Sequence, residues 1–351
     1  MGQSNCTGEC GASSQRDNSE QELAPEWLSW IVTNLLGGVS TAKLVDGLVE
    51  EDVPKNLAQR TVDAVAHSPL TTAALAHARK GQRAELTRRL LIEQQRLGDP
   101  SSEVPRRDCV DRETFLRRYV ATNTPVIFTD LVPRWPGFKR WSPENFKQRF
   151  GHVTLEVAQG RDADSNYDMN TERLTRPMRL AEFVDYVTSV DCSNDAYMVA
   201  KNRNLDKPEL QCLFEEMWFP EGWLDAKRVR RSSALWFGPK GTITPLHHDT
   251  SNILFCQVSG RKRFHLLSPL QTELADNALH MYAQLDPTSD EGREQLSSLH
   301  VKECTLEPGE ALFIPAGYWH HVQSLDVSIS VAVNSFTFPN TFDWFRPGNV
   351  S

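Results

Sequence analysis

The sequence predicts a mainly β fold, a double-stranded β-helix or jelly roll with helices around it, preceded by a small helical domain. Two observations support this prediction. From about residue 234 onward, many short strand-like segments are separated by glycine, proline or polar clusters, as in β-sandwiches and jelly rolls. Residues 25–97 instead repeat apolar side chains at helical spacing.

The composition narrows the class of protein. With 351 residues, of which 39% are hydrophobic, the chain can bury an extensive core. Its net charge of −8 argues against direct nucleic-acid binding, because phosphate contacts need a basic surface. Seven cysteines are scattered without a dense framework, so we expect free thiols and a cytoplasmic location. No apolar run is long enough for a bilayer span, so we expect no membrane association.

The N-terminal quarter is predicted to contain a tail and a helical domain. Residues 1–24 are rich in Ser, Gly, Gln, Asn and charge, and such a composition predicts a disordered tail. After Pro25, apolar residues recur at helical spacing until Gly37 and Gly38 stop the first helix. Further helical segments follow, giving a helical domain over 25–97. The polar, turn-forming residues 98–102 (GDPSS) mark the domain boundary.

The second domain is predicted over residues 105–345. Asp111 and Ser142 are expected to cap helices, the latter because Pro143 suits the first helical position. Strand-like segments are 125–128, 153–157, 234–237, 253–258, 263–267, 311–314 and 327–333. Glu215 and Glu216, which lie between the segments 153–157 and 234–237, are interpreted as a solvated charge pair.

Two histidine-rich segments carry the strongest chemical signal. The first is residues 244–249 (TPLHHD) and the second is residues 315–321 (PAGYWHH). If the first segment is extended, His247 and Asp249 project to one face and His248 to the other, because side chains alternate along a strand. A further histidine from the second segment would complete a two-histidine, one-carboxylate triad, which leaves positions open on non-haem iron.

A lone histidine–x–aspartate sequence is weak evidence, since a histidine near a strand is most often only a hydrogen-bonded structural residue. Here the surroundings add to it. Residues 244–269 (TPLHHDTSNILFCQVSGRKRFHLLSP) and 308–336 (PGEALFIPAGYWHHVQSLDVSISVAVNSF) resemble the two core blocks of the JmjC or cupin-like hydroxylase family. The resemblance extends more weakly back to about Asp111. It implies a cupin-like fold for the second domain and Fe(II), 2-oxoglutarate and dioxygen as cofactor and cosubstrates.

The resemblance also implies roles for individual residues. Its metal ligands fall on His247, Asp249 and His320, with His320 chosen over His321 because the family's last histidine follows an aromatic pair. It places the carboxylate-binding lysine of the 2-oxoglutarate site on Lys262, with Thr244 and Tyr197 offering hydroxyls and Asn334 beside the site. The chain departs from several relatives at Ile253, where they have an asparagine; here Asn252 stands one place earlier.

By this resemblance the chain is expected to be a 2-oxoglutarate-dependent dioxygenase, a hydroxylase that acts on a side chain of a protein or peptide substrate. Two alternatives remain open. One is an N-methyl-lysine demethylase that uses the same oxidant, ranked lower because the chain lacks an evident zinc finger such as a C-x₂-C pair. The other is a catalytically silent cupin that only binds. Paired tryptophans in the helical domain also suggest a homodimer or substrate capture.

Overall fold

The computed structural model describes residues 22–98, 101–271, 273–274, 278–279 and 281–343. The chain divides into two compact units, one up to Leu91 and one from Ile92 onward. The division falls within a long helix and not in the turn expected at 98–102. Most of the tail expected at 1–24 lies outside the described residues, whereas Leu23 packs partly buried against the first unit.

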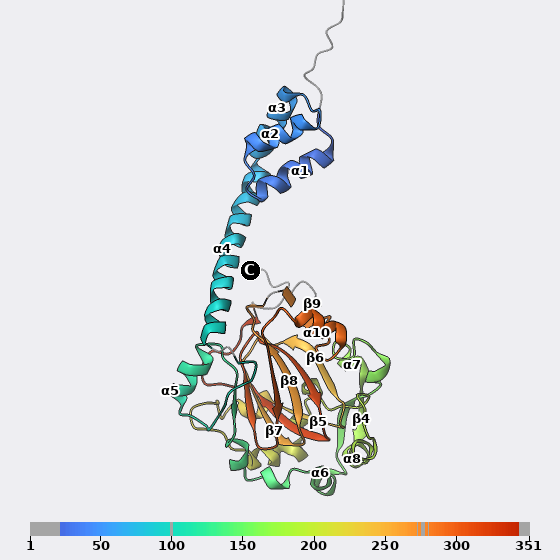
Figure 1. The fold of residues 1–351 in the computed structure, drawn as a ribbon. Coiled ribbons are helices and arrows are strands. Elements are labelled where there is room, and N and C mark those ends of the chain that lie inside the picture. The colour runs from blue at the N-terminus through green and yellow to red at the C-terminus, as the bar shows by residue number, and fades with distance from the viewer. Residues whose placement is uncertain (1–21, 99–100, 272, 275–277, 280, 344–351) are drawn as a thin grey trace, which may run out of the picture. The chain divides into compact units, whose positions relative to one another are not determined.

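Four helices form the N-terminal part of the chain (Figure 1), with bounds α1 Pro25–Leu36, α2 Thr41–Glu50, α3 Lys55–Ala66 and α4 Pro69–Gly98. The apolar faces of α1 to α3 meet in a small core formed by Ile31, Leu35, Leu44, Val45, Leu48, Ala58 and Val62. In α4, only Thr71 is buried. None of the helices in the described part of the chain combines the length and the apolar character that crossing a bilayer requires.

The second unit is built around two six-stranded sheets. The β7 sheet has the order β1 (Arg106–Arg107), β2 (Val126–Phe128), β12 (Ala311–Ile314), β7 (Ile253–Ser259), β14 (Ser328–Val333), β5 (Ser233–Gly238). The β6 sheet has the order β11 (Val301–Leu306), β8 (Lys262–Leu267), β13 (Trp319–Ser324), β6 (Ile243–His248), β10 (Tyr282–Ala283), β9 (Ala278–Leu279). Among the strand pairs that the structure describes in these two sheets, β1 with β2 is the parallel one and the others are antiparallel. Strands distant in sequence alternate in each sheet, which is the predicted jelly roll.

Burial explains why these segments form strands. Apolar residues from both sheets share one core, formed by Ile127, Phe255, Phe264, Leu266, Leu306, Leu312, Ile314 and Val322. The other face of the β7 sheet packs against surrounding helices through Phe115, Phe128, Phe146, Phe183, Trp223, Phe237 and Phe313. A strand covered on both faces needs apolar residues without alternation, and all four residues of β12 are accordingly buried.

The surrounding helices are α5 (Arg112–Phe115), α6 (Pro143–Phe150), α7 (Thr171–Leu174), α8 (Leu180–Ser189), α9 (Val229–Ser232) and α10 (Asp290–Leu296), and β3 (Thr154–Ala158) pairs with β4 (Thr175–Arg179). Both predicted caps are present. The Asp111 carboxylate accepts from the Thr114 backbone N–H at 2.9 Å, and the Ser142 hydroxyl accepts from the Asn145 backbone N–H at 3.2 Å.

The interpretation of Glu215 and Glu216 as a solvated pair was wrong for one member. Glu216 is buried. Its carboxylate accepts hydrogen bonds from the Trp141 indole at 2.7 Å and from the Arg149 guanidinium. Only Glu215 is exposed, where it pairs with Arg230. A buried carboxylate persists because its partners replace the hydrogen bonds that water would make.

Candidate metal centre

The first half of the candidate centre lies at the end of β6. His247 is the second-to-last residue of β6, and Asp249 follows directly after the strand. The side chains of both residues line the same cavity. Between them His248 is buried on the opposite side, with its ring edge-on to Trp319 at 4.8 Å between centroids. Period-two alternation therefore separates the two cavity-facing side chains from His248.

The second half comes from β13, which pairs antiparallel with β6. His320 lies directly opposite His247 in this register, and the pairing shifts just after His320. The His320 Nε2 atom is 3.5 Å from Asp249 Oδ2, and the His247 Nε2 atom is 3.8 Å from the same oxygen. One ligand atom from each of the three residues lies within 4.8 Å of the others.

The hydrogen bonds of the two imidazoles leave the nitrogens facing Asp249 available. His247 Nδ1 lies 2.8 Å from the Pro245 carbonyl oxygen, and His320 Nδ1 lies 2.9 Å from the Tyr318 carbonyl oxygen. An Nδ1–H donated to a carbonyl leaves a lone pair on Nε2, as in histidine ligands of metals. Burial, with His247 nearby, lowers the pKa of His320 well below its usual value. The donor set therefore fits a divalent metal such as Fe(II).

The side chain of His321 lies on the opposite face of the β6 sheet from that of His320, because successive side chains of a strand alternate. It is 1% exposed, lines a separate cavity, and its Nε2 atom is 3.9 Å from Asp286 Oδ1. Burial lowers the pKa of His321 to about 4. The three residues chosen from the sequence are thus brought together, while the two neighbouring histidines face away.

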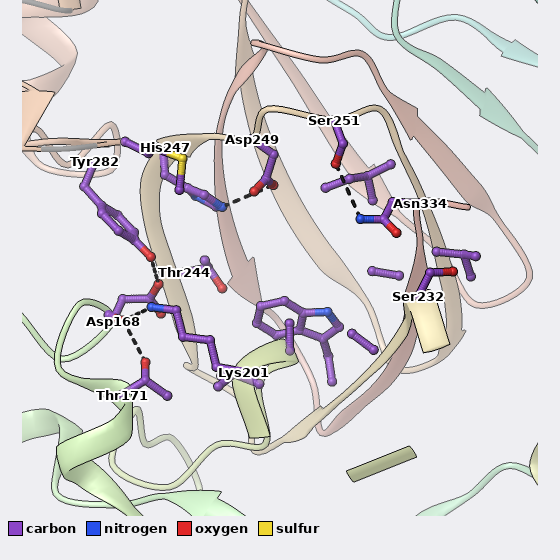
Figure 2. Close-up of a pocket in the computed structure, with 18 residues that line it drawn as sticks. Asp168, Thr171, Lys201, Ser232, Thr244, His247, Asp249, Ser251, Tyr282 and Asn334 are labelled. Carbon is purple, nitrogen blue, oxygen red and sulfur yellow. Dashed lines mark hydrogen bonds and ion pairs between the residues drawn. The ribbon is translucent and has the colours of Figure 1, made fainter. Parts of the chain in front are cut away.

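A cavity of about 260 Å³ opens beside this centre. Figure 2 shows His247 and Asp249 on one wall, with Tyr282, Asp168 and Lys201 on the adjoining wall. The Tyr282 hydroxyl donates to the Asp168 carboxylate, and its ring stacks on His247 with centroids 5.5 Å apart. The wall beside the metal centre is therefore held by side-chain contacts.

A narrower cavity of about 40 Å³ lies behind the centre and reaches Lys262. Lys262 is 1% exposed, and its Nζ atom donates to the Tyr197 hydroxyl at 2.7 Å. Thr244 also lines this cavity. Burial lowers the pKa of Lys262 to about 7. A buried ammonium of this kind favours an anionic ligand.

The remaining predicted residues are on the outer side. Asn334 is exposed, lines the larger cavity, and its amide lies 3.5 Å from the Ser251 hydroxyl. Ile253 lines both cavities. Asn252 instead accepts from the Ala316 backbone N–H at 3.0 Å, so its side chain joins the start of β7 to the turn before β13. Asn252 therefore does not take the place of the asparagine that several relatives have at the position of Ile253.

Sequence reasoning missed three polar residues of the cavity wall, Asp168, Lys201 and Tyr282. Asp168 and Tyr282 bond to each other across 114 positions of sequence. Lys201 donates to the Asp168 backbone carbonyl at 2.6 Å. All three lie in or beside irregular segments without periodic patterning, so no local signal pointed to them.

Comparison with known proteins gives one family match and several curated relatives. A sequence profile of the family described as "Cupin-like domain" matches residues 112–343. The chain is 30% identical to Lysine-specific demethylase 8 of Xenopus tropicalis, over 67% of this chain and 53% of that protein. It is 30% identical to Lysine-specific demethylase JMJ30 of Arabidopsis thaliana, over 65% and 54% of the two chains. Arginine-specific demethylase JMJ20 of the same plant is 28% identical, over 63% and 54%. The chain spans about half the length of these curated relatives.

Proposed function

Because the chain belongs to the JmjC-type cupin-like domain family, we propose that it is an Fe(II)- and 2-oxoglutarate-dependent oxygenase that hydroxylates a side chain of a protein or peptide. The observation that supports this most strongly is the convergence of His247, Asp249 and His320 from β6 and β13. A second is the buried Lys262 at the end of the narrower cavity.

In this proposal each residue has a defined task. His247 Nε2, His320 Nε2 and an Asp249 oxygen would hold the iron, a ligand set that leaves coordination positions open for the cosubstrate and dioxygen. When bound, iron and 2-oxoglutarate supply the activation of dioxygen, with decarboxylation of the cosubstrate to succinate. The chain contributes ligation, orientation and exclusion of water.

Lys262 neutralises the distal carboxylate of 2-oxoglutarate. Its ammonium lies near aromatic rings, 5.2 Å from the Phe255 centroid and 5.8 Å from the Trp236 centroid, so few other groups compete for it. Tyr197 holds the ammonium at 2.7 Å, and the hydroxyls of Tyr197 and Thr244 are available to donate to the same carboxylate. A charge-assisted pair in such apolar surroundings is stronger than one in water.

The wall formed by Asp168 and Lys201 supports hydroxylation over demethylation in this proposal, although Trp236 and Tyr282 also line the cavity. A methylated lysine is a cation, and cavities that take one offer carboxylates or aromatic cages. Here the Asp168 carboxylate already accepts from Tyr282 and lies 3.8 Å from Arg161 Nη1. The ammonium of Lys201 lines the same wall. The names of the curated relatives keep demethylation as the second candidate.

The test is mass spectrometry of candidate peptides incubated with the protein, Fe(II) and 2-oxoglutarate. Hydroxylation adds about 16 Da, the mass of one oxygen atom, and yields succinate. Loss of about 14 Da from a methylated peptide, with formaldehyde, would assign demethylation instead. If no succinate formed with any peptide or without one, the chain would be a catalytically silent cupin. Reactions without iron or without 2-oxoglutarate are the controls.

A further inference from the structure

Exposed large apolar side chains are found in the N-terminal helices. Among the described residues, the large hydrophobic side chains that are exposed are Leu28, Trp30, Val49, Leu70, Leu86, Leu90, Leu91 and Leu97. All eight lie in the helical segment between residues 28 and 97, and none lies in the jelly roll. Soluble proteins expose such side chains singly, whereas a group of them marks an interaction surface.

Three of these leucines lie on one face of α4. At 100° per residue, Leu86, Leu90 and Leu97 fall within about 40° of arc. Their exposed fractions are 67%, 57% and 83%. We call this the leucine face of α4. Leu86 and Leu90 are one helical turn apart, so a second helix can contact both side chains at once.

We propose that the leucine face of α4 pairs with the same face of a second copy of this chain, with the two helices antiparallel. If the two-fold axis passes near residue 88, Leu86 of one copy lies opposite Leu90 of the other, and the reverse holds as well. This is the self-complementary arrangement of a two-fold dimer. It forms a layer of four leucines, Leu86 and Leu90 of each copy, that are exposed in the single chain, while Leu97 lies opposite Arg79 of the second copy.

Charge selects the antiparallel direction. Arg83 then lies opposite Glu93 of the second copy, twice by symmetry. Within one chain Glu93 pairs with Arg96 at 3.3 Å, whereas Arg83 makes no ion pair among the described residues, so Glu93 would bridge the two arginines. A parallel pairing would place Glu93 against Glu93 and Arg79 against Arg79, because both residues lie close to the leucine face at 100° per residue. Like charges at such positions oppose association.

A membrane surface is a poorer partner for the same helix. Arginines and a lysine surround α4, at positions 79, 80, 83, 88, 89 and 96, so they are not confined to the side opposite the leucines. Insertion of the leucine face would carry Arg79 and Glu93 toward the lipid. An interfacial helix instead separates its charged and apolar faces.

The tryptophans noted in the sequence contribute less than α4. Trp27 and Trp30 contact each other edge-to-face with centroids 5.8 Å apart. Trp30 also lies close to Gly47, where an added Cβ would be 3.3 Å from the indole. Much of the apolar area of this pair is therefore used within the first unit, and the leucine face remains without a partner in the single chain.

The experiment is sedimentation velocity of the full-length protein from about 1 to 200 μM. We expect a monomer–dimer equilibrium with a dissociation constant on the order of 10 μM, as for a small interface. The double variant Leu86→Glu/Leu90→Glu should raise this constant more than about 30-fold. Leu70→Glu is the matched control, since Leu70 is 84% exposed on the opposite side of the same helix, and it should leave the constant unchanged.

Exchanging the charges of Arg83 and Glu93 tests whether the two α4 helices are antiparallel, and it changes no leucine. Arg83→Glu should weaken the dimer, and Arg83→Glu/Glu93→Arg should restore it. Thermal melting of each variant checks that the fold is intact. A monomer throughout the range, loss of the dimer in Leu70→Glu alone, or failure of the exchange to restore it would overturn the proposal. So would leucine-dependent binding of a monomer to anionic phospholipid vesicles.

Discussion

Replacing Lys262 with methionine tests how the cosubstrate is held. The change removes the ammonium but keeps much of the aliphatic stem, so the β8 strand and its neighbours should remain packed. We expect 2-oxoglutarate affinity to fall by about 2 to 3 kcal/mol, about 30- to 150-fold, if the ammonium pairs with a desolvated carboxylate.

The structure adds a pH dependence to this prediction. Burial lowers the pKa of Lys262 from 10.5 to about 7, which corresponds to about 5 kcal/mol as an order of magnitude. In the proposed site the carboxylate of 2-oxoglutarate requires the protonated lysine, whose fraction in the free protein falls about tenfold per pH unit above 7. Affinity for 2-oxoglutarate should therefore weaken about 50-fold between pH 7 and pH 9, with uptake of a proton on binding.

Stability without the cosubstrate should change with pH in the opposite direction. Between pH 7 and pH 10.5 the unfolded chain binds one proton more at Lys262 than the folded chain does. The free energy of unfolding therefore rises with pH across this window, and below pH 7 the burial cost of the charge is present in full. Lys262→Met should remove this contribution and raise stability, most of all near pH 6.

Calorimetry measures the affinity for 2-oxoglutarate and the proton uptake on binding. Mn(II) replaces iron, and buffers of different ionisation enthalpy are compared. Denaturant unfolding from pH 6 to pH 9 measures the stability slope. If wild-type and Lys262→Met bind 2-oxoglutarate equally well, the assignment of Lys262 is refuted. A wild-type affinity that is constant from pH 7 to pH 9 would contradict the lowered pKa of Lys262.

Three further substitutions and one control test other parts of the structure. Tyr197→Phe removes the hydroxyl that contacts Lys262 and should weaken 2-oxoglutarate binding by about 1 kcal/mol, less than Lys262→Met, in the same calorimetric assay. Trp223→Ala removes a buried ring stacked on Phe115 at 4.0 Å and should lower the free energy of unfolding by about 3 to 5 kcal/mol in urea. Glu216→Ala leaves Trp141 and Arg149 without their acceptor and should cost about 1 to 3 kcal/mol, whereas Glu215→Ala, at a side chain 75% exposed, should change stability by less than about 0.5 kcal/mol.

The strands of the jelly roll were predictable because burial leaves a local pattern. The segment 311–314 is apolar throughout and lies between Gly309 and Pro315. The observed strand β12 covers the same four residues, Ala311–Ile314. The alternation of His247, His248 and Asp249 was predictable for the same reason, since it depends only on an extended backbone. The choice between His320 and His321 needed the family resemblance, because nothing local separates two adjacent histidines.

The wall of the cavity could not be predicted in this way. Asp168 and Tyr282 are 114 positions apart and meet only in the folded chain. Glu216 was misread because its sequence neighbour Glu215 is exposed, while its own partners Trp141 and Arg149 are 75 and 67 positions away. Such contacts depend on tertiary packing, which no window of the sequence contains.

The most direct test of the central claim is metal binding by single alanine variants at the four adjacent histidines. Mn(II) stoichiometry is measured by calorimetry or by metal analysis after gel filtration, so the readout does not depend on turnover. We predict about one ion per chain for the wild type, His248→Ala and His321→Ala, and none for His247→Ala and His320→Ala. If His321→Ala lost the metal while His320→Ala kept it, the assigned centre would be contradicted.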